Sequence, residues 1–118
     1  MRPPTMISEQ FEIVVVPFPF VDAPVSKPRP ALVLSTAMFN RDNAHSVLAM
    51  ITTAARTRWP NDHPIRDLAP TGLRAASTVR FKLFTLDNRI IRRRAGHLST
   101  ADAEACRARL QSMLGFSC

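Results

Sequence analysis

Apolar runs of strand length alternate with polar, proline-rich segments along most of the chain. The runs are rich in Val, Ile, Phe and Thr and are bounded by Pro, Gly, Asn or Asp, which is the usual pattern of short strands. The pattern predicts strands over these residues: 13–16, 31–35, 46–52, a weaker one near 65, 78–81 and 89–93. Residues 1–10 precede it, and we expect them to form a flexible leader.

The clearest helical pattern lies near the end of the sequence. Ser99 or Thr100 is suited to cap its N-terminus, and Gly115 is suited to end it. Apolar positions recur three or four residues apart, as on one side of a helix: Ala103, Cys106, Leu110, Met113 and Leu114. A shorter helical turn is expected over residues 35–40, directly after the second strand.

Three of the expected strands, at residues 13–16, 31–34 and 47–51, are apolar on both faces. Such strands normally lie in a sheet that is covered on both sides, yet the sequence offers one convincing helix to cover a single face. We therefore expect a mainly β fold with short helices, in which a small barrel or twisted antiparallel sheet carries a C-terminal helix. The second face is expected to meet another subunit in a homodimer. A length of 118 residues fits a single domain over residues 1–118.

The charge of the chain favours a polyanionic partner. Sixteen Lys and Arg residues stand against nine Asp and Glu, and the net charge is +7. Only Lys27 and Lys82 are lysines, and the guanidinium of arginine suits phosphate contacts. The alternative is arginine usage inherited from a GC-rich genome. Arginines within residues 89–94 either add to this potential or protect an edge strand from aggregation.

Neither cysteines nor histidines suggest a metal or cofactor. Cys106 and Cys118 form no ligand pattern, and we expect no disulfide between them. His45, His63 and His97 lie in separate polar segments, where we expect loop residues rather than an acid–base pair. No apolar run is long enough to span a bilayer, so we expect a cytoplasmic protein.

Several stretches, in the expected order, are similar to one family. Residues 14–22 read VVVPFPFVD, residues 27–35 read KPRPALVLS, and residues 51–53 read ITT. Gly72-Leu73, the STVR stretch at residues 77–80 and the AGHLS stretch at residues 95–99 follow. Together they resemble the MazF/PemK family of toxin endoribonucleases from Phe11 to Leu114.

The resemblance implies a site. Arg29 matches the family's catalytic arginine, and Thr52 matches the hydroxyl residue that works with it. Without the family, the pattern favours a loop arginine paired with Asp22 or a carbonyl at Arg29, and an ordinary strand residue at Thr52. The loop at residues 56–63 combines cations with Trp59, which suits unpaired bases, or else packs as a corner. We expect these residues to contact RNA: Lys27, Thr53, Arg56, Arg58, Arg80 and Lys82.

The activity implied by the resemblance is sequence-selective cleavage of single-stranded RNA through the ribose 2′-OH, without a metal or other cofactor. The implied partners are a second copy of the chain and an acidic antitoxin. Two departures matter: Lys82 stands where an acidic residue is usual, and Phe11-Glu12 replaces Gly-Asp. Two rivals share the fold, namely a CcdB-like protein that binds gyrase and a non-catalytic homologue that binds only RNA or antitoxin.

Overall fold

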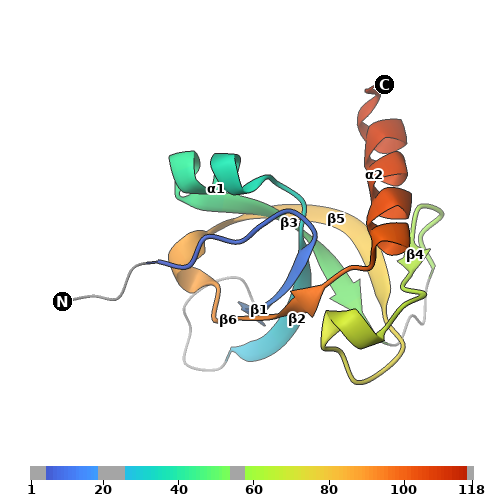
Figure 1. Cartoon of the computed structure of the whole chain (residues 1–118), viewed down its shortest axis with the longest axis horizontal. Coiled ribbons are helices and arrows are strands. Elements are labelled where there is room, and N and C mark those ends of the chain that lie inside the picture. Colours follow the sequence, from blue (N-terminus) through green and yellow to red (C-terminus); the bar gives the residue numbers. More distant parts are fainter. Residues whose placement is uncertain (1–4, 19–25, 54–57, 117–118) are drawn as a thin grey trace.

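A curled antiparallel sheet forms the body of the computed structural model, which describes residues 5–18, 26–53 and 58–116 (Figure 1). The strands are β1 (Glu12–Phe18), β2 (Lys27–Val33), β3 (His45–Thr52), β4 (His63–Pro64), β5 (Thr78–Asp87) and β6 (Arg93–His97). Their order in the sheet is β4-β5-β3-β2-β1-β6. The helices are α1 (Ala37–Asn43) and α2 (Thr100–Leu114), with short 3-10 turns η1 (Ala69–Thr71) and η2 (Asn88–Ile90). This confirms the expected mainly β fold with a C-terminal helix.

Each face of the sheet has its own core. On one face, strand residues such as Ile13 and Leu32 pack with Cys106 of α2. On the other, Val14, Val16 and their neighbours pack with residues of β5 and the segment after η2. Val14 and Val16 are completely buried by this chain alone. The two apolar faces therefore do not by themselves require a second subunit, contrary to the reasoning from the sequence, and the homodimer stays a prediction.

The prediction of a strand over residues 89–93 is wrong. The chain instead turns through η2, and β6 starts only at Arg93. The cause is Asp87, whose carboxylate caps the turn by accepting a hydrogen bond from the Arg89 N–H at 2.9 Å. Other strand bounds differ as well. The largest differences are that β2 begins at Lys27 rather than at residue 31, and that β5 continues to Asp87 rather than ending at residue 81.

The expected C-terminal helix is confirmed, with its caps. The Ser99 hydroxyl accepts a hydrogen bond from the Asp102 N–H at 3.2 Å, and Gly115 ends the helix with a φ of 79°. Only the first part of the expected apolar stripe is covered, since Cys106 is buried whereas Met113 and Leu114 are exposed. The expected turn after β2 is α1, which the Thr36 side chain caps.

The end of the expected leader is part of the fold. Ser8 is buried, and its carbonyl accepts a hydrogen bond from the buried Asn40 side chain at 2.9 Å. The N–H of Phe11 donates to the carbonyl of Val33 at 2.7 Å. The residues just before β1 are therefore held by contacts with distant segments, which differs from a flexible leader over all of residues 1–10. Residues 1–4 lie outside the described part.

Candidate functional site

The antiparallel pairing of β2 with β3 bears on how Arg29 and Thr52, the two candidate catalytic residues, lie relative to each other. The recorded partners are Ala31 with Met50, Leu32 with Ala49 and Val33 with Leu48. Continued by two residues, this antiparallel register sets Arg29 opposite Thr52, and side chains two apart point to the same face of a sheet. On that extended register, the two residues that the resemblance selected, from segments distant in the sequence, would lie at one end and on one face of the sheet.

Pairing between β2 and β3 stops just before this point. Arg29 remains paired with Val16 of β1, and Thr52 with Thr78 of β5. Pro28 and Pro30 flank Arg29 and have no amide hydrogen to donate to a neighbouring strand. The sequence thus ends the ladder where the two candidate side chains lie.

Arg29 presents its charge to solvent. The residue is exposed, and its guanidinium carbon lies 6.0 Å from the centroid of the Phe18 ring. Within residues 5–18, 26–53 and 58–116, no carboxylate forms an ion pair with it. Asp22, the partner considered from the sequence, lies outside these residues. Arg29 can accordingly act on an anion that comes from solution.

Hydroxyl groups line the neighbouring strand ends. Thr52 is partly buried, Thr53 is exposed directly after β3, and Thr78 begins β5 opposite Thr52. A hydroxyl can donate one hydrogen bond to an anionic oxygen. Nothing in the sequence singled out Thr78, because the register of β3 against β5 was not predicted.

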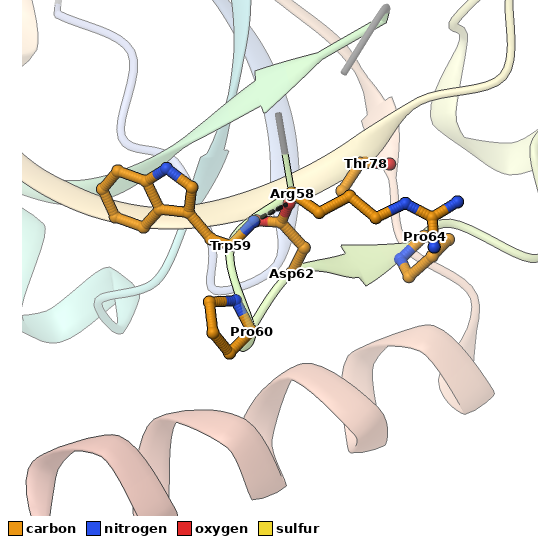
Figure 2. Close-up of a pocket in the computed structure, with 6 residues that line it drawn as sticks. All are labelled: Arg58, Trp59, Pro60, Asp62, Pro64 and Thr78. Atoms are coloured by element: carbon orange, nitrogen blue, oxygen red, sulfur yellow. Dashed lines mark hydrogen bonds between the residues drawn. The ribbon is translucent and has the colours of Figure 1, made fainter. Parts of the chain in front are cut away.

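A cavity of about 680 Å³ adjoins Thr78. Besides Thr78 and Pro64, it is lined by the residues of one short loop: Arg58, Trp59, Pro60 and Asp62. Figure 2 shows Arg58 extending toward Thr78 and Pro64, while Trp59 points the other way. Since Thr78 pairs with Thr52, this cavity lies beside the candidate centre. The expected contact residue Arg58 is therefore near the site.

Arg80 is held by an acidic residue that sequence reasoning missed. Its Nη2 lies 2.9 Å from Asp62 Oδ2, and its Nε lies 3.2 Å from Asp62 Oδ1. The hydrogen bond from Arg80, followed by that from the Trp59 N–H, lowers the pKa of Asp62 despite partial burial. Asp62 thus places a carboxylate beside Arg80, although Lys82 replaces the acidic residue that the family usually has. Direct contact of Arg80 with RNA stays a prediction.

Three further residues were expected to contact RNA, and the structure describes two of them, Lys27 and Lys82. Lys27 is exposed at the start of β2 and pairs with Phe18. Lys82 is exposed where the register of β5 shifts against β3, a bulge that bends the sheet. Arg56 lies outside the described residues.

A second basic surface lies on the other side of Arg29. Arg89 and Arg92 line a cavity of about 370 Å³ together with Pro17, whose strand partner is Pro28. The Arg92 Nη2 donates to the Ser26 hydroxyl at 2.7 Å, which ties the residue before β6 to the residue before β2. Arg89 is neutralised by Asp87, whose pKa falls to about 2 through hydrogen bonds from Arg89. Arg92 is thus the more available cation of the two.

The expectation that the three histidines are loop residues is wrong, because His45 begins β3, His97 ends β6 and His63 lies in β4. His63 is buried in β4 rather than in a loop, and its Nε2 lies 2.8 Å from Asp102 Oδ1 of α2. Burial acts to raise the pKa of Asp102, but hydrogen bonds from the Asp67 N–H, His63 and the Arg66 N–H lower it overall. This buried pair is away from solvent and fastens β4 to α2.

Among the residues that the structure describes, no group of three or more His, Cys, Asp and Glu side chains could hold a metal ion. In the same part of the chain, no helix combines the length and the apolar character needed to cross a bilayer.

Comparison with solved structures identifies the fold. A MazE–MazF complex from Deinococcus radiodurans has 22% sequence identity and a TM-score of 0.73, over 95% of this chain and 99% of that chain. An endoribonuclease from a mycobacterial species has 18% identity and a TM-score of 0.72, over 97% of each chain. A mycobacterial endoribonuclease bound to its cognate antitoxin has 17% identity and a TM-score of 0.71, over 95% and 97%.

Sequence comparison identifies the family. No curated protein sequence matches the chain. Residues 9–114, however, match the family described as the PemK-like, MazF-like toxins of type II toxin–antitoxin systems. That match spans both candidate residues, Arg29 and Thr52, and all the strands and helices of the fold. The chain belongs to this family of toxins.

Proposed function

We propose that this toxin is a sequence-selective endoribonuclease that cleaves single-stranded RNA through the ribose 2′-OH without a metal. The observation that carries the proposal is the register of β2 and β3, whose last recorded pair is Ala31 with Met50. Extended by two residues, that register would bring Arg29 opposite Thr52. Family membership supports the same pair, since these two residues match the family's motifs. Two solved structures of similar fold are themselves called endoribonucleases.

The reaction makes modest demands on the protein, because the RNA supplies its own nucleophile. The 2′-oxygen loses its proton and attacks the adjacent phosphorus, while the bond from phosphorus to the 5′-oxygen breaks and that oxygen gains a proton. The products are a 2′,3′-cyclic phosphate and a free 5′-hydroxyl. The protein must hold these atoms in line and stabilise the charge that builds on the phosphate oxygens.

Arg29 and Thr52 suit the stabilising role. A guanidinium keeps its charge at any physiological pH and donates to two phosphate oxygens at once. It is a poor proton donor for the same reason, so we assign Arg29 to charge stabilisation and not to acid catalysis. The Thr52 hydroxyl would donate to the same phosphate. Preorganised donors of this type contribute about a hundredfold to a thousandfold each in rate.

Several cations near the pair would hold the rest of the strand. Lys27, Arg58 and Lys82 are exposed around the candidate centre, and Thr53 offers a further hydroxyl. With Arg56 and Arg80 they form the proposed RNA contact set, in agreement with a net charge of +7. Arg80 contributes indirectly as well, because it fixes the loop that carries Arg58.

The proposed partners follow from charge and from the related structures. A MazE–MazF complex and an endoribonuclease bound to its antitoxin share this fold. We propose an acidic antitoxin segment that covers the basic site, a homodimeric toxin and a cytoplasmic location.

The test is digestion of a long RNA by the purified protein in EDTA, with the new 5′ ends mapped. Cleavage at a recurrent short sequence, leaving 5′-hydroxyl ends, is the expected result. Arg29→Ala should slow it about a hundredfold or more, while Arg41→Ala, which removes an exposed arginine on α1, should not. Cleavage that stops on chelation and returns with a divalent ion would reject the mechanism. An intact RNA with every protein preparation would favour a binding protein of the same fold.

A further inference from the structure

The loop that carries Trp59 is built to hold the indole in place. The Trp59 N–H donates to Asp62 Oδ2 at 3.0 Å, and the Asp62 N–H donates back to the Trp59 carbonyl at 3.0 Å. The Arg80 guanidinium carbon lies 5.3 Å from the centroid of the indole ring, and Arg80 is itself fixed by two hydrogen bonds to Asp62. From α2, Arg109 donates to the carbonyl of Asn61 at 3.4 Å. The ring is therefore preorganised although it lies in a loop.

The same indole remains accessible. Trp59 is 43% exposed, an unusual surface position for so large an apolar group. A guanidinium can cover only one face of a ring, so the contact with Arg80 does not by itself block the exposed part of the indole from a ligand. A held but uncovered aromatic ring is what a stacking partner requires, since little freedom remains to be lost on binding.

Trp59 also separates two cavities of different character. The cavity of about 680 Å³ holds Arg58 and Thr78 and lies beside Thr52. The second cavity, of about 320 Å³, is lined by Trp59 with Phe81 and Met113, and by the polar groups of Asn61 and Ser112. One side thus offers a cation and a hydroxyl, which suit a phosphate and ribose. The other offers apolar walls with an amide and a hydroxyl, which suit the flat face and polar edge of a base.

We propose that Trp59 is the stacking platform for one unpaired base of the RNA, next to the phosphate that Arg29 and Thr52 would hold. The base enters the cavity of Trp59, Phe81 and Met113, while its backbone follows Arg58 and Thr78. Asp62 is a positioning residue, because it acts through Arg80 and the loop. This inference rests on the proposed function, and it adds a specific subsite and a reason for preferring single strands, whose bases are free to leave the stack.

Intrinsic fluorescence tests the subsite directly, because Trp59 is the only tryptophan and the chain has no tyrosine. The probe is a short mixed-sequence RNA strand that is 2′-O-methylated throughout and so cannot be cleaved. We expect it to quench the fluorescence of the wild-type protein. The same strand without bases, or annealed to its complement, should quench far less. Equal quenching by the baseless strand would overturn the proposal, since charge alone would then explain it.

Variants separate stacking from folding. Trp59→Ala should weaken binding of the probe about tenfold to a hundredfold, whereas Trp59→Phe should retain most of it. Phe39→Ala is the matched control, because Phe39 is 40% exposed on α1, which Figure 1 shows far from β4 and α2. Asp62→Asn should weaken binding and also make the free protein's fluorescence more accessible to acrylamide. Unchanged binding by both Trp59→Ala and Asp62→Asn would overturn the proposal.

The design distinguishes this inference from the proposed function. Quenching by the probe, together with no cleavage of ordinary RNA, would reject the nuclease and support the subsite. Cleavage of ordinary RNA at the wild-type rate by Trp59→Ala, without quenching of the wild-type protein, would reject the subsite and support the nuclease.

Discussion

His63 of β4 and Asp102 of α2 form a buried pair, with 2.8 Å between Nε2 and Oδ1. The Asp102 carboxylate also accepts hydrogen bonds from the backbone N–H groups of Arg66 and Asp67, at 3.0 to 3.2 Å. One side chain of the helix therefore fixes both β4 and the segment that follows it. The cavity beside Trp59 is lined by Phe81 of the adjacent strand β5 and by Met113 of α2. By holding α2 against β4, the Asp102 anchor therefore also supports the loop next to the candidate site.

Removing the carboxylate should destabilise the fold strongly. Asp102→Ala leaves buried donors without an acceptor, so we expect a loss of about 3 kcal/mol or more in the free energy of unfolding. Denaturant unfolding would measure it. The control Asp42→Ala removes an exposed carboxylate on α1 and should change the stability little. Equal stabilities of the two variants would show that the Asp102 contacts add nothing.

The same carboxylate gives stability a dependence on pH. The pKa of Asp102 is lower in the folded chain than the usual value of 3.8, so the folded state favours the charged form. Its contribution should be complete well above pH 3.8 and should decline as the pH falls through that value toward the lower folded pKa. Unfolding measured at several pH values should show this decline in wild type and a flatter profile in Asp102→Asn.

Gly96 of β6 should tolerate no side chain. A Cβ added there would lie 2.3 Å from the carbonyl oxygen of Pro70 and 2.6 Å from Thr71, both in η1. Gly96→Ala should therefore force β6 and η1 apart and cost about 1 to 3 kcal/mol. The comparison is Gly115→Ala, where space is open and only the positive φ of 79° opposes the change, at about 1 to 2 kcal/mol. Separation of β6 from η1 in the Gly96 variant should appear as faster amide exchange there, with Gly115→Ala unchanged.

Local patterns predicted much of the fold. Ser99 and Gly115 marked the ends of α2 because caps act within a few residues of the sequence. The turn at η2 was missed although Asp87-Asn88, a pair of common turn residues, gave a usable signal. The motifs selected Arg29 and Thr52 as candidates, and their role stays a prediction; the structure adds the recorded register of β2 and β3, which stops two residues short of them.

Pairs distant in sequence could not be predicted. Asp62 with Arg80 and His63 with Asp102 each join segments whose approach depends on the folded sheet. Charge and hydropathy are the same for an ion pair as for two separate surface residues, so the sequence alone does not reveal them. Two apolar faces suggested a second subunit for the same reason, since the sequence does not reveal contacts between distant segments. The curl of the sheet and the residues around η2 cover the second apolar face within the chain.

Arg92 should affect binding more than chemistry. Its hydrogen bond to Ser26 holds it beside the start of β2, the strand that carries Arg29. This is the opposite side of the candidate centre from Trp59. If it contacts a phosphate, Arg92→Ala should weaken RNA binding and lower the slope of log K against log salt by about 1, with kcat unchanged. Binding to uncleavable RNA at several salt concentrations would measure this. A loss in kcat with an unchanged salt slope would place Arg92 in the chemistry instead.

The joint action of Arg29 and Thr52 is tested most directly by a double-mutant cycle on the rate of RNA cleavage. We predict that Arg29→Ala and Thr52→Val each slow cleavage about a hundredfold or more, and that the double variant is little slower than the slower single one, because both side chains stabilise one phosphate. Thr85→Val, at an exposed threonine of β5, is the control and should cleave normally. Cleavage by Arg29→Ala at the wild-type rate, or losses that multiply in the double variant, would contradict the joint action of this pair.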